Sequence, residues 1–278
     1  MSIKELLIFS KTSKENNILV KKRIRLIRND LARNGLRQQE IDDILLNKQS
    51  FINFVKDNRI NEVIVILKYF PDYVNIKDGS NITALMHASE EGNTEIVRLL
   101  VERGADVNTQ DNYNTTALMA ASRRGYTEIV RMLLDAGVHL EIKDESGDTA
   151  LTYATSNNHT ETARILLDNG ANVKTLDGIN QSVLFNVSSN FPDLYQLLID
   201  RGADVNVQDS EEGNTALISI LQYYQQGNNN QLQIIIMLLE NGADPNIQNF
   251  ENKTALMYAN EKGDQQIIDL LIQHGATQ

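Results

Sequence analysis

The chain has 278 residues, of which 41 % are hydrophobic, and it carries a net charge of −11 at neutral pH without a single cysteine. This composition is typical of a folded protein, and the lack of cysteine excludes disulfides, thiolate metal sites and a cysteine nucleophile. The charge is uneven, because residues 1–48 hold 11 Lys and Arg against 6 Asp and Glu, whereas the remainder holds 15 against 31. An acidic body disfavours binding along a nucleic-acid backbone, since Lys and Arg supply that affinity.

The N-terminal segment, residues 1–48, is predicted to form a helical head. Between residues 18 and 34, apolar residues recur at helical spacing and make one stripe, formed by Val20, Ile24, Ile27 and Leu31. A second short helix is expected at residues 38–46. A lone amphipathic helix is marginal in water, so the stripe needs an apolar surface to pack on. The chain that follows is an array of repeats, described below, and the first repeat of such an array needs a cover for its apolar face. We therefore predict that residues 18–46 cap this first repeat, with Val63, Val65 or Ile66 against the stripe.

After the head, one short pattern recurs at a fixed interval. Thr-Ala-Leu begins at residues 83, 116, 149, 215 and 254, and a looser copy, Ser-Val-Leu, begins at residue 182. From 83 to 215 the starts are evenly spaced, but the last step is longer by an insertion within the polar run 222–231. That run is expected to be an exposed loop. Ser50, one period before Thr83, opens a degenerate first copy, so the period predicts seven stacked repeats.

Each unit is predicted to contain two short helices. In the second repeat, Thr83 is placed to cap the first helix, and Gly92 is placed to end it in the left-handed conformation. The fifth repeat departs from this pattern, because Phe191-Pro192 stands where other repeats have glycine and the bulky Val187 stands where they have alanine. Since stability in a repeat array is roughly a sum of repeat and neighbour contributions, we expect the fifth repeat to be the weakest joint.

These features resemble the ankyrin repeat. The residues that carry the resemblance are the Thr-Ala-Leu openings, Gly92, Gly125 and Gly263 between helices, the run Glu95–Leu100, and Gly-Ala-Asp at 104–106, 202–204 and 242–244. The resemblance covers about residues 47–278. It implies an all-α, ankyrin-type solenoid of about seven helix-turn-helix repeats in residues 49–278, with residues 1–48 as an N-terminal helical cap. Where the family often has Pro and His, this chain has Ala84 and Met86, so packing by Met is expected to replace the hydrogen bonds of His.

The sequence contains no recognisable catalytic constellation. The four histidines, at 87, 139, 159 and 274, occupy different positions within their repeats and should be spread along the array. No Gly-rich phosphate loop follows a strand pattern, and helix ends account for the glycines. We therefore expect a protein that is not an enzyme and that uses no metal and no cofactor.

Ankyrin-like proteins typically bind partner proteins on the concave face built from hairpin tips and first helices, so the resemblance implies an interaction scaffold or adaptor. Carried over by position, the candidate partner-binding residues are Tyr113, Thr115, Arg123, Arg124, Asp148, Asn157, Tyr223 and Phe250. Exposed aromatic and Arg side chains dominate interface energetics, although a hairpin also tolerates a surface tyrosine that binds nothing. The alternative is a delivery module whose basic helix, residues 18–37, docks to an anionic membrane surface or to nucleic acid.

The expected partners are one or more proteins, bound by a monomer, rather than nucleic acid or a membrane. The N-terminus lacks a small-residue cleavage site, and no apolar run reaches the roughly 18 residues of a membrane span. These features favour an intracellular, cytoplasmic location, with the nucleus or the cytosol of a host cell left open.

Overall fold

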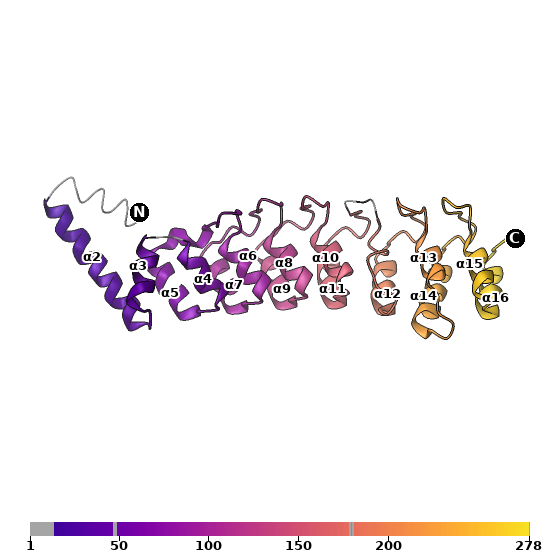
Figure 1. Ribbon diagram of the computed structural model, residues 1–278, viewed down its shortest axis with the longest axis horizontal. Helices are drawn as coiled ribbons and strands as arrows, with labels where there is room; N and C mark the ends of the chain where they lie inside the picture. The colour runs from indigo at the N-terminus through magenta and orange to yellow at the C-terminus, as the bar shows by residue number, and fades with distance from the viewer. Residues whose placement is uncertain (1–13, 47–48, 178, 180, 278) are drawn as a thin grey trace. The chain divides into compact units, whose positions relative to one another are not determined.

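The computed structural model describes residues 14–46, 49–177, 179 and 181–277 (Figure 1). Apart from two isolated bridges, Lys77 with Thr83 and Leu176 with Ser182, the regular structure of these residues is helical. This confirms the predicted all-α class. The described residues pack as two compact units. The first unit holds the residues up to Ala121 together with Glu128–His139, and the second holds Ser122–Thr127 and the residues from Leu140 onward.

The first unit opens with the head, which consists of α2 (Lys14–Arg33) and α3 (Gln38–Leu46). Helix α2 begins at Lys14 rather than at the predicted Ile18. Its stripe is buried at Ile27 and Leu31, and α2 packs on α5 (Ile60–Tyr69), in which Val63, Val65 and Ile66 are buried. The side chain of Val20 lies outside the described part of the chain. The head therefore covers the first repeat, as the unpartnered apolar stripe predicts.

Polar contacts fix the head at the edges of this apolar contact. The Asp30 carboxylate of α2 accepts hydrogen bonds from the Tyr69 hydroxyl at 2.7 Å and from Lys68 Nζ at 2.9 Å, and the Tyr69 bond is the main cause of the lowered pKa of Asp30. In α3, Glu40 bonds with Arg37 and with Arg59, and these contacts lower the pKa of Glu40 to about 2. Charge pairs therefore complement the apolar face of the head.

The remaining elements of the first unit are short helices at the predicted spacing. They are α4 (Ser50–Lys56), the 3-10 helix η1 (Pro71–Asn75), α6 (Ala84–Glu91), α7 (Thr94–Glu102), and the parts of α8 (Ala117–Arg124) and α9 (Thr127–Asp135) that fall within this unit. The first repeat consists of α4 and α5, the second of α6 and α7, and the third of α8 and α9. In the first repeat η1 follows α5 at Pro71, the position that glycine occupies in later repeats.

The predicted helix signals act as expected in the second repeat. Thr83 Oγ1 accepts the backbone N–H of Met86 at 3.2 Å, and Gly92 ends α6 in the left-handed conformation with φ of 75°. The expectation that Met86 would only pack was incomplete. Its thioether sulfur accepts the Thr83 N–H at 3.3 Å, which completes a reciprocal cap with a weak acceptor.

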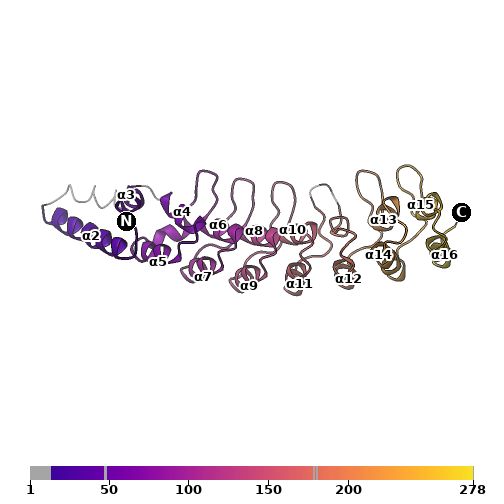
Figure 2. The same cartoon turned by 60° about the horizontal axis from the view of Figure 1, so that its bottom comes forward.

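The second unit holds four further repeats. The fourth repeat has α10 (Ala150–Ser156) and α11 (Thr160–Asp168), the fifth α12 (Pro192–Asp200), the sixth α13 (Ala216–Gln222) and α14 (Asn229–Glu240), and the seventh α15 (Ala255–Lys262) and α16 (Gln265–Gln273). Within this unit, α10, α13 and α15 lie on the side of the hairpin loops, and α11, α12, α14 and α16 lie on the other side (Figure 2). We call the face made by the hairpins and first helices the hairpin face.

Leucines fill the space between these two layers, and the turns are tied to one another. The buried leucines include Leu151, Leu166, Leu198, Leu217, Leu238, Leu256 and Leu271. Beyond the helices, Asn206 Oδ1 accepts the Asp244 N–H at 2.8 Å, and Asn246 Oδ1 accepts the Thr277 N–H at 2.8 Å. The turns that end in Asn206 and Asn246 therefore also bond to the turn of the following segment.

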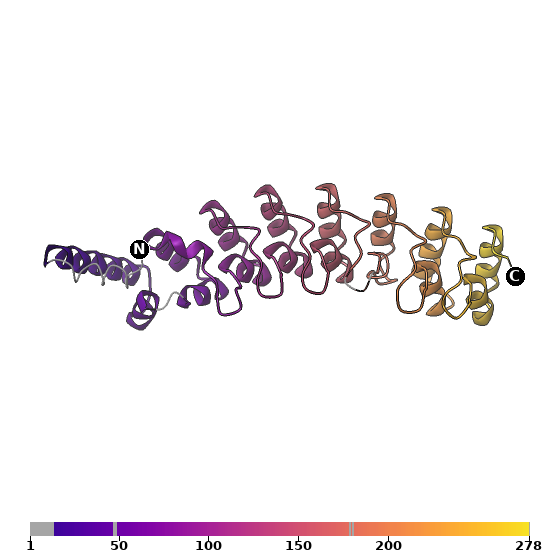
Figure 3. The ribbon, with the colours of Figure 1, turned by 90° about the horizontal axis from the view of Figure 1, so that it is seen from above.

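The fifth repeat lacks its first helix. Residues 183–187 form turns and a bend in place of the predicted helix, and the ribbon of Figure 3 is irregular in this stretch. The Phe185 N–H bonds to the Ser182 carbonyl at 2.9 Å, and the Tyr195 hydroxyl donates to the Val187 carbonyl at 3.2 Å. Valine, asparagine and serine are weaker helix formers than the alanines of the other repeats, so the turn is not carried on into a helix. The second helix, α12, begins at Pro192 as predicted.

The insertion in the sixth repeat forms a loop at residues 223–228, between α13 and α14, and most of this loop is exposed. This confirms the predicted exposed loop for these residues, with Tyr224 as a buried exception. The Tyr224 hydroxyl donates to Asp264 at 3.1 Å, and Gln231 Oε1 accepts the Gln225 N–H at 2.9 Å. Side chains therefore tie the loop to its own backbone and to a neighbouring repeat, and the predicted run was too long only at its helical ends.

Candidate functional site

The hairpin at residues 209–214 leads into α13 and forms one wall of the site. Asp209 is only 8 % exposed, and its Oδ1 accepts backbone N–H groups of Glu211 at 2.9 Å and of Glu212 at 2.7 Å. Its Oδ2 accepts the Asn214 N–H at 3.1 Å. An aspartate that bonds to the backbone ahead of it fixes a turn, so the hairpin is held without any partner.

A cleft of about 330 Å³ lies between the fifth and sixth repeats on the hairpin face. Its apolar lining comes from the turns of the fifth repeat and from α12 and α13, namely Phe185, Val187, Tyr195, Ala216 and Ile220. Its acidic lining comes from the hairpin, namely Asp209, Glu211 and Glu212. Two of its lining residues, Phe185 and Val187, lie in the turns that replace a first helix in the fifth repeat.

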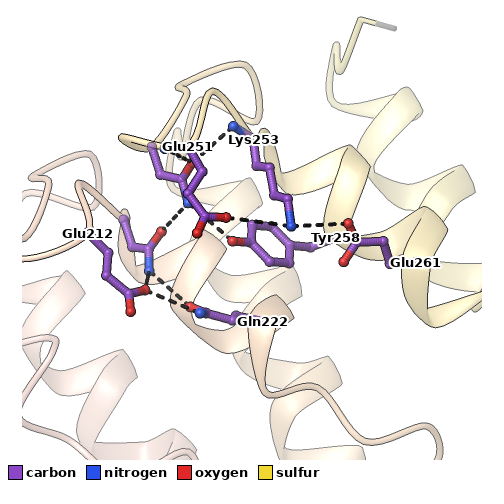
Figure 4. Close-up of polar contacts among 8 residues, drawn as sticks. Glu212, Gln222, Glu251, Lys253, Tyr258 and Glu261 are labelled. Atoms are coloured by element: carbon purple, nitrogen blue, oxygen red, sulfur yellow. Dashed lines mark hydrogen bonds and ion pairs between the residues drawn. The ribbon is translucent and has the colours of Figure 1, made fainter.

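A chain of amide contacts links this hairpin to the seventh repeat (Figure 4). Glu212 Oε2 accepts Asn214 Nδ2 at 2.7 Å and Gln222 Nε2 at 3.2 Å. Asn214 Oδ1 in turn accepts Asn249 Nδ2 at 2.9 Å, which also lies 3.2 Å from the Tyr258 hydroxyl. The cleft wall is therefore braced through buried amides from the next hairpin.

Lys253 is already engaged on the far side of this network. Its Nζ lies 3.3 Å from Glu261 Oε1 and 3.6 Å from Glu251 Oε2, and 5.0 Å from the centroid of the Tyr258 ring (Figure 4). The bond with Glu261 is the main cause of the raised pKa of Lys253. No Lys or Arg is among the described residues that line the cleft, so its charged lining is acidic throughout.

Two of the predicted residues lie at this site. Tyr223, at the end of α13, is 69 % exposed and lines the cleft. Phe250 is 68 % exposed, and its ring covers Gly213, where a Cβ atom would stand 2.6 Å from the ring. The Phe250 N–H also donates to the Glu212 carbonyl at 2.9 Å. Both aromatic side chains therefore flank the same hairpin while remaining open to solvent.

Three other predicted residues gather near Tyr153 of α10 in the same unit. The guanidinium carbon of Arg123 lies 5.9 Å from the Tyr153 ring centroid, and Asn157 Nδ2 donates to the Tyr153 carbonyl at 2.9 Å. Burial raises the pKa of the half-buried Asp148, and the carboxylates of Asp144 and Asp177 reinforce the shift. Asn157 therefore serves its own helix end, whereas Arg123 is exposed at the surface.

The remaining predicted residues are separate from these groups. Tyr113, which is 63 % exposed, and the half-buried Thr115 belong to the first unit, where their backbone N–H groups bond to Asp111 Oδ1 at 2.9 and 2.8 Å. Arg124 is exposed at the end of α8. Tyr113 therefore stands on a hairpin that its own aspartate holds in shape.

Sequence reasoning missed the residues that line the cleft, above all Phe185, Tyr195 and Glu211. One signal was available, because Val187 and Phe191 already marked the fifth repeat as irregular. The prediction still gave that repeat a first helix, where the structure has turns that carry Phe185 and Val187 of the cleft lining.

First helices in two other repeats bond back to their own hairpins. The Tyr153 hydroxyl donates to Asp144 Oδ2 at 2.6 Å, and His87 Nε2 lies 2.9 Å from Asp78 Oδ2. Burial, with Asp144 next in effect, raises the pKa of Tyr153. These side chains therefore hold the hairpins against the helices.

Two further histidines also make structural contacts. His159 Nε2 lies 3.1 Å from the Arg123 carbonyl, and its ring occupies the space where a Cβ on Gly125 would stand at 2.6 Å. His274 Nδ1 lies 2.9 Å from the Leu270 carbonyl. Among the residues that the structure describes, no cluster of three or more potential metal ligands is present.

Comparison with known proteins places these repeats in a family. The model of ankyrin repeats in three copies matches residues 29–144, 108–177 and 183–278, which together span most of the chain. The chain belongs to the ankyrin-repeat family. Ankyrin-repeat domains are generally protein–protein interaction modules. The family match begins inside the head, at residue 29, in α2.

Two similar proteins illustrate the relationship. An ankyrin repeat protein of Acanthamoeba polyphaga mimivirus is 35 % identical over 80 residues, which cover 29 % of this chain and 45 % of that protein. The match thus spans less than half the length of this relative. The crystal structure of the ankyrin repeat domain of Bcl-3, a member of the IkappaB protein family, superposes with a TM-score of 0.68 and 28 % identity, covering 80 % of this chain and 97 % of that domain.

None of the helices in the described ranges combines the length and apolar character that crossing a bilayer requires.

Proposed function

We propose that this ankyrin-repeat protein is a non-enzymatic interaction scaffold that binds a partner protein on its hairpin face, with Tyr223 and Phe250 as anchors. The observation that carries the proposal is that two aromatic side chains, 69 % and 68 % exposed, flank one braced hairpin beside a cleft of about 330 Å³. Exposed aromatic side chains on a rigid base lose little conformational entropy on binding and are enriched among the residues that dominate interface energetics.

The other predicted residues extend the proposal along the hairpins. Arg123, Arg124 and Asp148 in the second unit, and Tyr113 and Thr115 in the first, are proposed as further contacts with the same or another partner. Asn157 is the weakest member of the set, because its side chain already bonds to the Tyr153 carbonyl. The proposed scaffold is a monomer that acts inside the cell and needs no cofactor.

The competing idea of a delivery module finds no support in the head. The apolar stripe of α2 is buried at Ile27 and Leu31, and α2 packs on α5 rather than offering that stripe to a membrane. A basic amphipathic helix needs a free apolar face to lie in a membrane interface. The head is therefore proposed to act as a cap.

The test is quantitative affinity purification from cells that express the tagged full-length chain. Proteins recovered with the wild type are compared with those recovered with Tyr223→Ala, Phe250→Ala and the double variant. Ile272→Ala is the matched control, because Ile272 is 53 % exposed and lies on α16, away from the hairpin face. We expect a specific partner to be lost from the double variant and kept by the control. A partner recovered equally with all variants would overturn the assignment.

A further inference from the structure

We propose that the cleft between the fifth and sixth repeats receives a short, extended, basic segment of a partner protein, in which Lys or Arg stands beside an apolar side chain. This inference rests on the proposed function and names the chemistry of the partner. Its starting point is the lining of the cleft, in which apolar side chains, called the floor below, lie together with the carboxylates of the hairpin, called the rim, and with amide and hydroxyl side chains.

The charge of the rim selects a cation. Asp209 is saturated by backbone N–H groups, and Glu212 Oε2 by two amides, but the exposed Glu211 carboxylate forms no hydrogen bond or ion pair with the described residues. No basic residue in the described chain lines the cleft to neutralise it. Acidic rims attract basic partners and repel acidic ones, so charge complementarity sets the sign of the occupant.

The floor selects an apolar group in addition to the charge. Val187, Tyr195 and Ile220 are buried around it, while Phe185 is half-buried and Tyr223 stands exposed at its edge. A fully hydrated cation such as a polyamine would leave this floor wet. An aliphatic or aromatic side chain would cover it and gain about 25 cal/mol for each Å² of apolar surface removed from water.

The size of the cleft limits how much of a partner can enter it. One or two side chains of an extended strand fit in about 330 Å³, while the flanking basic groups remain at the rim beside Glu211 and Glu212. A helix, about 10 Å wide with its side chains, would lie across the mouth and insert the side chains of one face only. The proposed occupant is therefore an extended peptide segment.

The experiment uses the full-length chain and a displayed library of random nonapeptides as the probe. We expect enrichment of peptides with Lys or Arg next to an apolar residue, and we expect binding to weaken as ionic strength rises. Enrichment without a basic preference, or no enrichment at all, would overturn the proposal. The enriched consensus peptide is then labelled, and its affinity is measured by fluorescence anisotropy, together with that of the same peptide carrying Glu at its basic positions.

Two matched double variants locate the site. Glu211→Gln with Glu212→Gln removes two rim charges while keeping an amide oxygen for Asn214 and Gln222 to bond. Asp193→Asn with Glu240→Gln removes two exposed charges from α12 and α14, outside the cleft. The rim variant should bind the peptide about fivefold to thirtyfold more weakly, as expected for two exposed ion pairs, and the control within about twofold of wild type. Equal affinities in the two variants would refute the site.

A single variant, a sedimentation measurement and the capture experiment separate the remaining explanations of a change in peptide binding. Glu211→Gln alone guards against misfolding of the double variant, because this carboxylate has no hydrogen bond or ion pair in the described chain; it should weaken binding by about threefold. If wild type self-associates in sedimentation and the rim variant does not, the occupant is the basic head of a second copy, and the partner-protein assignment fails. If partner capture still depends on Tyr223 and Phe250 but the library shows no basic preference, this inference fails while the proposed function stands.

Discussion

The fourth and fifth repeats, which both lie in the second unit, have equivalent positions in the repeat pattern but differ in structure. Leu151 and Leu184 lie one repeat period apart and are both buried, so each repeat fills its share of the core. Around Leu151 the chain forms α10, whereas around Leu184 it forms successive turns. The difference teaches that the period decides where a segment packs, and the residues within it decide whether it becomes a helix.

The opening residue of each repeat shows why the fourth repeat forms a helix and the fifth forms turns. Thr149 Oγ1 accepts the N–H of Thr152, three residues on, and Thr152 Oγ1 accepts the Thr149 N–H at 2.7 Å, which is a helix cap. Ser182 Oγ instead accepts the N–H of Leu184, two residues on, at 3.4 Å. Serine that bonds two residues ahead offers the backbone an alternative to the helix. The turns that follow carry Phe185 and Val187, which line the cleft on the hairpin face.

The largest expected effect on the free energy of unfolding comes from truncating the two equivalent core leucines to alanine. Leu151→Ala should lower the free energy of unfolding by about 3–5 kcal/mol, and Leu184→Ala by about 2–3 kcal/mol, because turns beside a cleft can collapse further into the space. Urea unfolding followed by circular dichroism measures both. Ile272→Ala, at an exposed position, should stay within about 0.5 kcal/mol of wild type. An equal loss of unfolding free energy in Leu151→Ala and Leu184→Ala would show that the two repeats pack their core leucines equally well.

Hydrogen exchange compares the local stability of the two segments directly. Amides of residues 184–190 should open at a free energy about 2 kcal/mol below those of residues 151–157, because the fifth repeat has no helical ladder there. Native-state exchange read by NMR or mass spectrometry reports both segments in one sample. The amides of α13 provide the internal reference. Uniform protection across the three segments would show that the fifth repeat is no weaker than its neighbours.

Two buried polar side chains in the second helices of these repeats, Tyr195 and Thr162, should respond differently to the loss of their hydroxyl groups. The buried Tyr195 hydroxyl donates to the Val187 carbonyl at 3.2 Å, so Tyr195→Phe should cost about 1–2 kcal/mol. Thr162, in the second helix of the fourth repeat, has a buried Oγ1 without a hydrogen-bond partner in the described structure, so Thr162→Val should be neutral or stabilise by up to about 1 kcal/mol. Thermal unfolding measures both variants. Unchanged stability of Tyr195→Phe would contradict the proposed role of its bond, and a loss in Thr162→Val would contradict the expected gain from removing an unpaired hydroxyl.

The smallest expected effect concerns charge at the hairpin face, where Asp148 in the fourth repeat corresponds to Gln181 in the fifth. Because burial raises the folded-state pKa of Asp148, the folded chain holds that proton more tightly than the unfolded chain. Stability is therefore lost as pH rises from 3.8, the usual value, through the raised pKa. Asp148→Asn should stabilise slightly at neutral pH, within about 0.5 kcal/mol, and lose this advantage in acid.

The control for that measurement is Asp193→Asn, which removes one exposed charge from α12. Urea unfolding of both variants at neutral pH and in acid separates a local burial penalty from a general effect of net charge. If the two variants change in parallel across the pH range, the burial of Asp148 is not the cause.

By itself, the sequence determined the repeat spacing, the helix ends and the apolar stripe of the head. These features depend on residues within a few positions of one another. Thr83 caps its helix whatever lies beyond it, and Gly92 adopts a left-handed conformation that a β-carbon disfavours. The stripe at Ile27 and Leu31 likewise demanded a cover, and α5 supplies it. The family assignment follows from the same local pattern.

Only the tertiary structure decided what occupies the space between repeats. The cleft needs Phe185, Tyr195, Glu211 and Tyr223 to meet across two repeats, and no spacing rule reports the volume left between side chains that are distant in sequence. The burial of Tyr224 within the otherwise exposed loop at residues 223–228 was missed for the same reason, because its partner Asp264 lies in the next repeat. Local rules fix the backbone of each repeat, while the fit of neighbouring repeats fixes which side chains remain open to a partner.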